Sequence, residues 1–239
     1  TAISFNGVPT ILAHAGQPVP FSARSQDPGS DDLRLRWKWD DGTADTVTDN
    51  LVNPPNPDPL PSPSIQPRDV TDAKSHTFGK ACFYEVKFSS LDDDTGSGQD
   101  AINVVIVGNA TQVRSAGYWQ TNFGKVLGAP GKKDFDAPAL LCYVKIAGYA
   151  STVFDEVRNA STLPLAYGVL NVSQNGGTMT ELFDRQLLAA WLNFANGAIG
   201  YGQLVDSNGD GTADTAFSVV VSVAEAVRTN PASTPAQIE

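Results

Sequence analysis

The chain changes its sequence pattern at about residue 108, and this change limits the folds open to it. Before that point, short apolar runs alternate with glycine, proline, aspartate and asparagine, which is typical of an all-β sandwich. After it, prolines become sparse and apolar residues recur at steps of three and four, which indicates amphipathic helices. The 239 residues are enough for two small domains. We therefore predict an α+β chain in two modules, an all-β sandwich over residues 1–108 and a mostly α-helical module over residues 109–239.

Five strands are expected in the first module. They are Ala2–Phe5, Pro18–Ser25, Leu33–Trp39, Ala81–Ser90 and Ala101–Val107. The clearest is Leu33–Trp39, in which basic residues alternate with leucine and tryptophan. Successive side chains of a strand point to opposite faces, so we expect the aromatic side to face the core and the basic side to face solvent.

A proline-rich insertion interrupts this module at about residues 51–70. Seven of the sixteen prolines fall within residues 54–67. Because proline fixes φ and lacks an N–H donor, no central strand or helix can cross this segment. An extended, polyproline-like excursion is predicted. It is either a stiff loop or a surface for a partner with aromatic grooves.

Five segments of the first module, taken in order, carry a family resemblance. They are Phe21–Gly29, Trp37–Gly42, Ser75–Phe78, Tyr84–Phe88 and Leu91–Gly96. Together they resemble a PKD (polycystic kidney disease) domain, an immunoglobulin-like β-sandwich of extracellular proteins, although the turn at Trp39–Gly42 is shorter than usual. The resemblance implies a structural role for His76. Some domains of this family bind Ca²⁺ through acidic turn residues, which here would be Asp27 and Asp92; solvated turn carboxylates are the alternative.

The second module is expected to contain four helices. They are Asp136–Val157, one near Pro164–Leu170, Glu181–Ala195 and Ala216–Val227. Thr178 and Glu181 match a capping box at the start of the third helix. Apolar residues cover most of the circumference of that helix, so we expect it at the centre of the second core. Gly117–Gln120 and the Arg185–Gly197 run resemble an uncharacterised helical module that follows PKD-like domains in extracellular bacterial proteins, and that resemblance implies no activity.

Oxygen-bearing residues recur in the loop before the last predicted helix. Side chains at loop positions 1, 3, 5 and 9, and the backbone carbonyl at position 7, are those of Asp206, Asn208, Asp210, Asp214 and Thr212. Glycine at position 6 permits the sharp turn that converging oxygen ligands of Ca²⁺ require. The loop resembles that of an EF-hand, in particular the loop–helix half of dockerin-type modules. Position 12 is Phe217 instead of a bidentate glutamate, so weak Ca²⁺ binding is expected, with a Kd of roughly 10⁻⁴ to 10⁻³ M. A metal-free turn is the alternative.

The two cysteines, Cys82 and Cys142, fall in different predicted modules. In an oxidising compartment they could form a disulfide that joins the modules. Two buried free thiols are the alternative.

Charge and motif content narrow the function. A net charge of −10 and a pI of about 4.5 argue against nucleic-acid binding, and no apolar run reaches the length of a membrane span. The first residue is not methionine, which suggests a removed leader or a trimmed chain. With only His14 and His76 there is little material for a catalytic triad, and the sequence has no zinc spacing or phosphate-binding loop. Paired carboxylates of a glycosidase remain an alternative to a protein without catalytic role.

These observations predict a non-catalytic bacterial protein, secreted or at the cell surface, that binds Ca²⁺ and serves cell adhesion, matrix or display. Its partner would be an unidentified extracellular protein or glycan, and self-association stays open. One alternative is a carbohydrate- or protein-binding accessory region of a secreted hydrolase. Another is the subunit of an extracellular filament built by strand addition at a sandwich edge.

Overall fold

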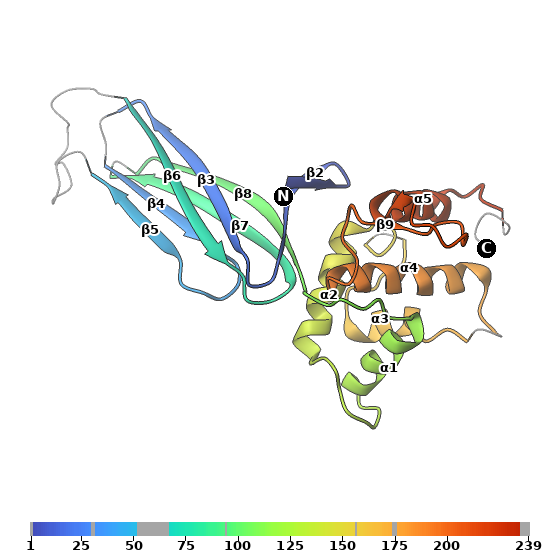
Figure 1. Cartoon of the computed structure of the whole chain (residues 1–239). Helices are drawn as coiled ribbons and strands as arrows, with labels where there is room; N and C mark the ends of the chain where they lie inside the picture. Colours follow the sequence, from blue (N-terminus) through green and yellow to red (C-terminus); the bar gives the residue numbers. More distant parts are fainter. Residues whose placement is uncertain are drawn as a thin grey trace.

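The computed structural model describes residues 2–29, 32–51, 67–93, 95–155, 157–173 and 176–234. These residues form a β-sandwich and a group of helices that lie end to end (Figure 1). The predicted α+β arrangement in two parts is confirmed. The proline-rich insertion predicted at about 51–70 lies largely outside the described residues.

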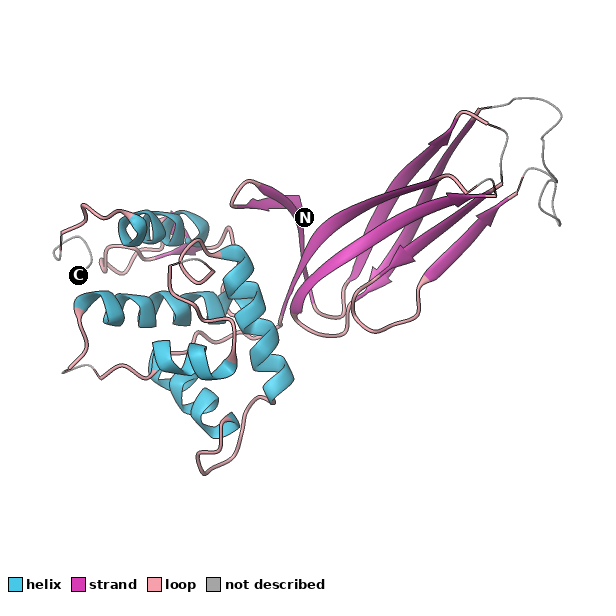
Figure 2. Cartoon of the chain, turned by 180° about the vertical axis from the view of Figure 1, so that it is seen from behind, coloured by secondary structure: helices cyan, strands magenta, loops and turns pink. Residues whose placement is uncertain are grey.

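Eight strands of the described chain build the sandwich. They are β1 (Ala2–Phe5), β2 (Val8–His14), β3 (Pro18–Asp27), β4 (Leu33–Lys38), β5 (Thr46–Asn50), β6 (Arg68–Thr77), β7 (Cys82–Asp92) and β8 (Ser97–Val107). Six of them form one sheet in the order β1-β2-β8-β7-β4-β5, and β3 pairs with β6 in the other. All pairs are antiparallel except β2 with β8, which is parallel. Figure 2 shows the two layers facing each other.

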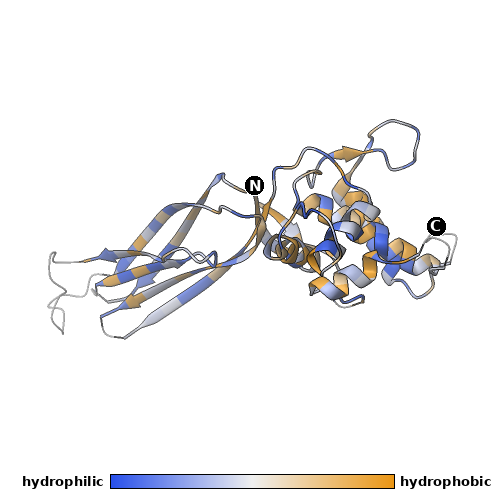
Figure 3. Ribbon diagram, turned by 90° about the horizontal axis from the view of Figure 1, so that it is seen from below, coloured by the Kyte–Doolittle hydropathy of each residue, from blue (hydrophilic) through white to orange (hydrophobic). Residues whose placement is uncertain are grey.

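Strand β4 has the predicted alternation. Leu33, Leu35 and Trp37 are buried, and the basic residues between them are exposed. The rings of Trp37 and Trp39 stack in the core, with centroids 5.6 Å apart and planes 4° from parallel. Hydrophilic and hydrophobic bands therefore alternate along the strands in Figure 3, as the period of two requires.

Five helices of the described chain form the second part. They are α1 (Ala116–Val126), α2 (Ala137–Ala150), α3 (Leu163–Leu170), α4 (Met179–Ala195) and α5 (Phe217–Thr229). Helix α4 is the buried centre, with Leu188, Leu192 and Phe194 fully inaccessible to solvent. The capping box at its start is present, because Thr178 accepts from the Glu181 N–H and Glu181 accepts from the Thr178 N–H. Within the described residues, no helix is both long enough and apolar enough to cross a membrane.

Helix α2 ends earlier than expected, at Ala150 instead of Val157. Ser151 takes an extended backbone conformation with φ −101° and ψ 137°. Its hydroxyl oxygen then accepts from the N–H groups of Val153 (3.1 Å) and Phe154 (3.3 Å). The Ser151 hydroxyl thus offers the backbone hydrogen bonds that compete with those of the helix. The helix therefore ends here, although the apolar stripe in the sequence continues. Phe154 is still buried.

The two parts share apolar residues where they meet. The ring of Phe5, at the end of β1, lies 4.9 Å from Tyr201 and 6.0 Å from Phe194 between centroids, inside the helical core. Strand β8 serves both cores, because its alternate faces carry Val105 and Val107 toward the helices and Ile106 toward the sandwich. The two apolar cores therefore lie on opposite faces of one strand.

Candidate metal site

The oxygen-rich loop joins two short paired strands to helix α5. Strands β9 (Leu204–Val205) and β10 (Thr215–Ala216) pair antiparallel on either side of it. The first N–H groups of α5 bond back to the chain before the loop, from Phe217 to the Gln203 carbonyl (2.8 Å) and from Ser218 to the Tyr201 carbonyl (3.0 Å). Both ends of residues 206–214 are thus held against the same helix terminus.

Asp206 organises the first half of the loop. Its carboxylate accepts from the N–H groups of Gly209 (2.7 Å) and Gly211 (2.8 Å). Both glycines have positive φ, +79° and +87°, a conformation that costs other residues steric strain. The N–H groups of Gly211 and Gly209 hold the pKa of the Asp206 carboxyl below its usual range, so the group is charged at neutral pH.

The Asn208 amide lies between two carboxylates of the loop. Its Nδ2 is 3.2 Å from an oxygen of Asp210 and 3.5 Å from an oxygen of Asp214, and its Oδ1 accepts from the Asp210 N–H at 2.9 Å. Asp210 also accepts from the Thr212 N–H at 2.7 Å, which, with the Asn208 amide, lowers the pKa of its carboxyl. The loop thus carries three carboxylates, which are ligands of the type that Ca²⁺ prefers, with the amide nitrogen of Asn208 turned toward two of them. The described residues contain no preformed group of three or more His, Cys, Asp or Glu side chains that could hold a metal ion.

Position 12 of the loop has a structural role instead of a ligand role. Phe217 is 3% exposed, and its ring stacks on Phe194 with centroids 6.1 Å apart. An aromatic anchor at this point fixes the start of α5 on the helical core. The substitution of the usual glutamate is therefore explained by packing.

A buried carboxylate that the sequence pattern does not reveal as a site residue holds the other end of the same helix. Glu225 of α5 is 6% exposed and accepts from the Trp191 indole N–H at 2.8 Å. It also accepts from the N–H (3.0 Å) and the hydroxyl (2.9 Å) of Thr152. The signal in the sequence was one acidic residue on the otherwise apolar face of the last helix.

Cys82 of β7 and Cys142 of α2 form a disulfide, with their Cα atoms 4.6 Å apart. Together with the main chain, this bond links the sandwich to the helices covalently, and the described residues include no free cysteine. Disulfides persist in oxidising environments such as the periplasm and the cell exterior.

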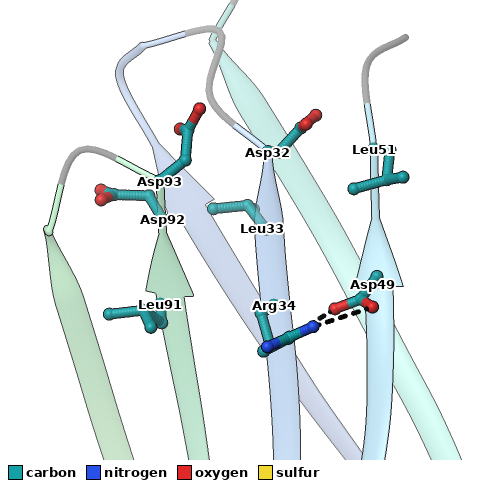
Figure 4. Close-up of a pocket in the computed structure, with 8 residues that line it drawn as sticks. All are labelled: Asp32, Leu33, Arg34, Asp49, Leu51, Leu91, Asp92 and Asp93. Atoms are coloured by element: carbon teal, nitrogen blue, oxygen red, sulfur yellow. Dashed lines mark hydrogen bonds and ion pairs between the residues drawn. The ribbon is translucent and has the colours of Figure 1, made fainter. Parts of the chain in front are cut away.

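The acidic turn residues that the family resemblance pointed to lie at the far end of the sandwich. Asp27 accepts from the Gly29 N–H at 2.6 Å, and Asp92 accepts from the Gly96 N–H, so each closes its own turn. Asp92 lines a hollow with Asp32 and Asp93, whereas Asp27 is not among its lining residues (Figure 4). Of the two predicted residues, this hollow therefore includes Asp92 alone among the residues that the structure describes.

Both histidines have structural partners. His76 bonds through Nε2 to an Asp41 oxygen at 2.8 Å and stacks on Trp39 with ring centroids 4.3 Å apart. Burial alone would raise the pKa of Asp41, but hydrogen bonds from Thr43 and His76 lower it overall. His14 bonds through Nδ1 to the Gly108 carbonyl at 2.8 Å. Each histidine ring therefore has a hydrogen-bond partner within the folded chain.

Comparison with solved structures finds weak likenesses, of which one is described here. The PKD domain of an M14-like peptidase from Thermoplasmatales archaeon SCGC AB-540-F20 is similar in structure, with a TM-score of 0.27 and 16% sequence identity, over 41% of this chain and 93% of that chain. No protein-family model matches the chain, and no curated protein does.

Proposed function

We propose that this chain is a non-catalytic, calcium-binding protein of the bacterial cell exterior that serves adhesion, matrix or display. The observation that carries the proposal is the oxygen-lined loop 206–214 clamped between β9, β10 and the start of α5. A divalent cation would draw the three carboxylates of this loop together and neutralise the repulsion between them.

The residues that would hold Ca²⁺ are Asp206, Asn208, Asp210 and Asp214, with the backbone carbonyl of Thr212. Their chemistry fits a hard cation, and their number, without a glutamate at position 12, fits the weak affinity of extracellular modules. When bound, the ion would tie the β9–β10 pair to α5, which Phe217 and Glu225 anchor to α4. Calcium would then stabilise the helical part of the molecule.

Location outside the cytoplasm is supported by the Cys82–Cys142 disulfide and by the PKD-like character of the sandwich. A rigid, disulfide-linked pair of folded units suits a protein that presents a surface to a partner.

Calcium titration of the metal-free protein by isothermal calorimetry tests the proposal. We expect one site with a Kd of roughly 10⁻⁴ to 10⁻³ M, abolished by Asp210→Ala. Absence of heat at millimolar Ca²⁺, or an equal response from Asp210→Ala, would refute it.

A further inference from the structure

A hollow beside the start of α1 is lined by three sequence segments that the calcium proposal leaves unused. Its volume is about 640 Å³, and its lining includes Gln112, Arg114, Tyr118, Asp134, Phe135 and Asn196. Binding sites for small molecules occupy roughly 300–1,000 Å³. We call this feature the Tyr118 hollow. Its lining residues belong to the helical part and do not include any residue of loop 206–214.

Buried asparagines hold two walls of the Tyr118 hollow in place. The side chain of Asn193 accepts from the Arg114 N–H and donates to the Arg114 carbonyl, both at 2.8 Å. The side chain of Asn122 accepts from the Asp134 N–H at 3.2 Å and donates to the Tyr118 carbonyl at 3.1 Å. Both asparagines are at least 97% buried. The backbones that present Arg114 and Asp134 are therefore fixed before any ligand arrives, which reduces the entropy lost on binding.

Aromatic surface forms the floor. The Arg114 guanidinium lies 4.7 Å from the Tyr118 ring centre, and the Tyr118 hydroxyl donates to Asp134 at 3.0 Å. The ring of Phe135 stacks on Trp119, with centroids 5.4 Å apart. Tyr118 and Phe135 are half-buried, so each keeps part of its surface open to the hollow.

Asn196 offers an amide at the edge of the hollow. It is 8% exposed, and its Oδ1 accepts from the Tyr143 hydroxyl at 2.9 Å. This bond fixes the orientation of the amide, whose Nδ2 hydrogens are the donors that it can offer to a ligand.

These contacts lead us to propose that the Tyr118 hollow binds a neutral sugar unit of an oligosaccharide. The charges of Arg114 and Asp134 cancel, which suits a ligand without net charge. The planar guanidinium, carboxylate and amide groups can each form hydrogen bonds with two neighbouring hydroxyls of a sugar. The C–H face of the sugar can pack on a half-buried aromatic ring. A free amino acid would rely on two exposed ion pairs, which contribute little in water. The proposal goes beyond calcium binding and does not depend on it.

An array of neutral oligosaccharides tests the proposal with the full chain. The probes are printed glucans, mannans, xylans, galactans and chitin oligomers, and each bound probe is then titrated in solution. We expect Arg114→Ala and Asp134→Ala to weaken binding by about tenfold or more, the loss expected for a hydrogen bond to a charged group. Gln112→Ala, an exposed change in the same lining, serves if either variant fails to fold. The matched control is Arg34→Ala, which removes an exposed arginine at the far end of the sandwich and should leave binding unchanged.

Three results would overturn the proposal. The first is no binding to any printed saccharide. The second is binding that Arg114→Ala, Asp134→Ala and Gln112→Ala leave unchanged. The third is saturable binding of free phenylalanine or glycine in place of the sugars. Each titration is repeated in calcium and in chelator. Sugar binding through loop 206–214 would require the ion and would be unaffected by Arg114→Ala. Such a result would refute this proposal and leave the calcium proposal standing.

Discussion

Gly108 and Gly197 cross with their backbones in contact, so that a Cβ on Gly197 would lie 2.0 Å from the Gly108 carbonyl oxygen. Gly197 also has a φ of +84°, in the left-handed region. Next to this crossing, the Gly108 N–H donates to the Ala195 carbonyl at 2.9 Å and the Ala110 N–H donates to the Asn196 carbonyl at 3.0 Å. The chain that leaves the sandwich is thus bonded directly to the end of α4.

Gly197→Ala should destabilise the protein strongly. The new methyl group meets backbone instead of a flexible side chain, and the left-handed conformation adds its own strain. We expect the free energy of unfolding to fall by roughly 3 kcal/mol or more. Urea unfolding followed by tryptophan fluorescence measures the loss.

The matched control is Gly148→Ala in α2, where an added Cβ would have no neighbour within 4 Å. Alanine is the better helix former, so this variant should gain up to about 1 kcal/mol. Equal effects of the two substitutions would show that the crossing is not tight.

Removal of the disulfide should destabilise the protein without separating its two parts. The bond closes a segment of 60 residues, for which chain entropy predicts a loss of about 4 kcal/mol in Cys82→Ala/Cys142→Ala. Because β8 and Phe5 join both cores, we still expect one unfolding transition. Urea titrations of the variant and of the wild type, followed by fluorescence and by circular dichroism, measure both effects.

Wild-type protein in reductant is the control, and its loss of stability should match that of the double variant once both thiols are free. Two separate transitions would mean that the shared residues do not couple the sandwich to the helices.

A segment of this fold can be predicted from the sequence when its apolar residues recur with the period of a strand or of a helix. Strand β4 was predictable because every second side chain is apolar. Strand β6 was not, since its buried residue is Asp72, which accepts from the Trp37 indole N–H at 2.7 Å. Such a hydrogen bond satisfies a polar side chain in the core, but its partner lies 35 residues away in sequence.

Helix α1 was missed for a similar reason. It contains Gly117 and Gly124, which lower helix propensity. A Cβ on Gly124 would lie 3.3 Å from the Tyr167 ring, so glycine there permits α1 to approach α3. The packing of α1 against α3, which no local sequence pattern reveals, therefore stabilises this helix.

The two candidate sites also differ in whether the sequence alone could predict them. The ligand set of loop 206–214 is consecutive in sequence, so its spacing alone suggests a metal. The Tyr118 hollow brings together Arg114, Asp134 and Asn196 from three separate segments, and only the folded chain shows them as neighbours.

Calcium should raise the melting temperature. At about 10 mM Ca²⁺, a Kd of roughly 10⁻⁴ to 10⁻³ M adds about 1.4–2.7 kcal/mol to the free energy of unfolding. For a chain of this size that is a rise of roughly 3–10 °C relative to chelator. Scanning calorimetry in calcium, in magnesium and in chelator measures the shift.

Asp210→Ala should abolish most of this rise in melting temperature, because it removes one of the three carboxylates proposed to bind the ion. Asp100→Ala, which removes an exposed carboxylate from β8, is the control and should keep the full rise. A rise that survives Asp210→Ala would place calcium elsewhere on the molecule.

Tyr84 makes stability depend on pH in the alkaline range. Burial raises the pKa of its hydroxyl to about 12, with a smaller contribution from the negative charges of Asp41 and Asp40, and the hydroxyl donates to the Lys80 carbonyl at 2.9 Å. Unfolded tyrosine ionises near pH 10, so between about pH 10 and 12 the unfolded state has lost a proton that the folded state keeps, and stability falls as pH rises. Tyr84→Phe lacks this titration but loses the hydrogen bond, so it should be about 1 kcal/mol less stable than wild type at pH 8. The gap should narrow above about pH 10 and close or reverse before about pH 12, because each pKa unit is worth about 1.4 kcal/mol. Urea unfolding of both proteins across this range measures it, and a gap that stays constant would mean that Tyr84 ionises as readily in the folded chain as in the unfolded one.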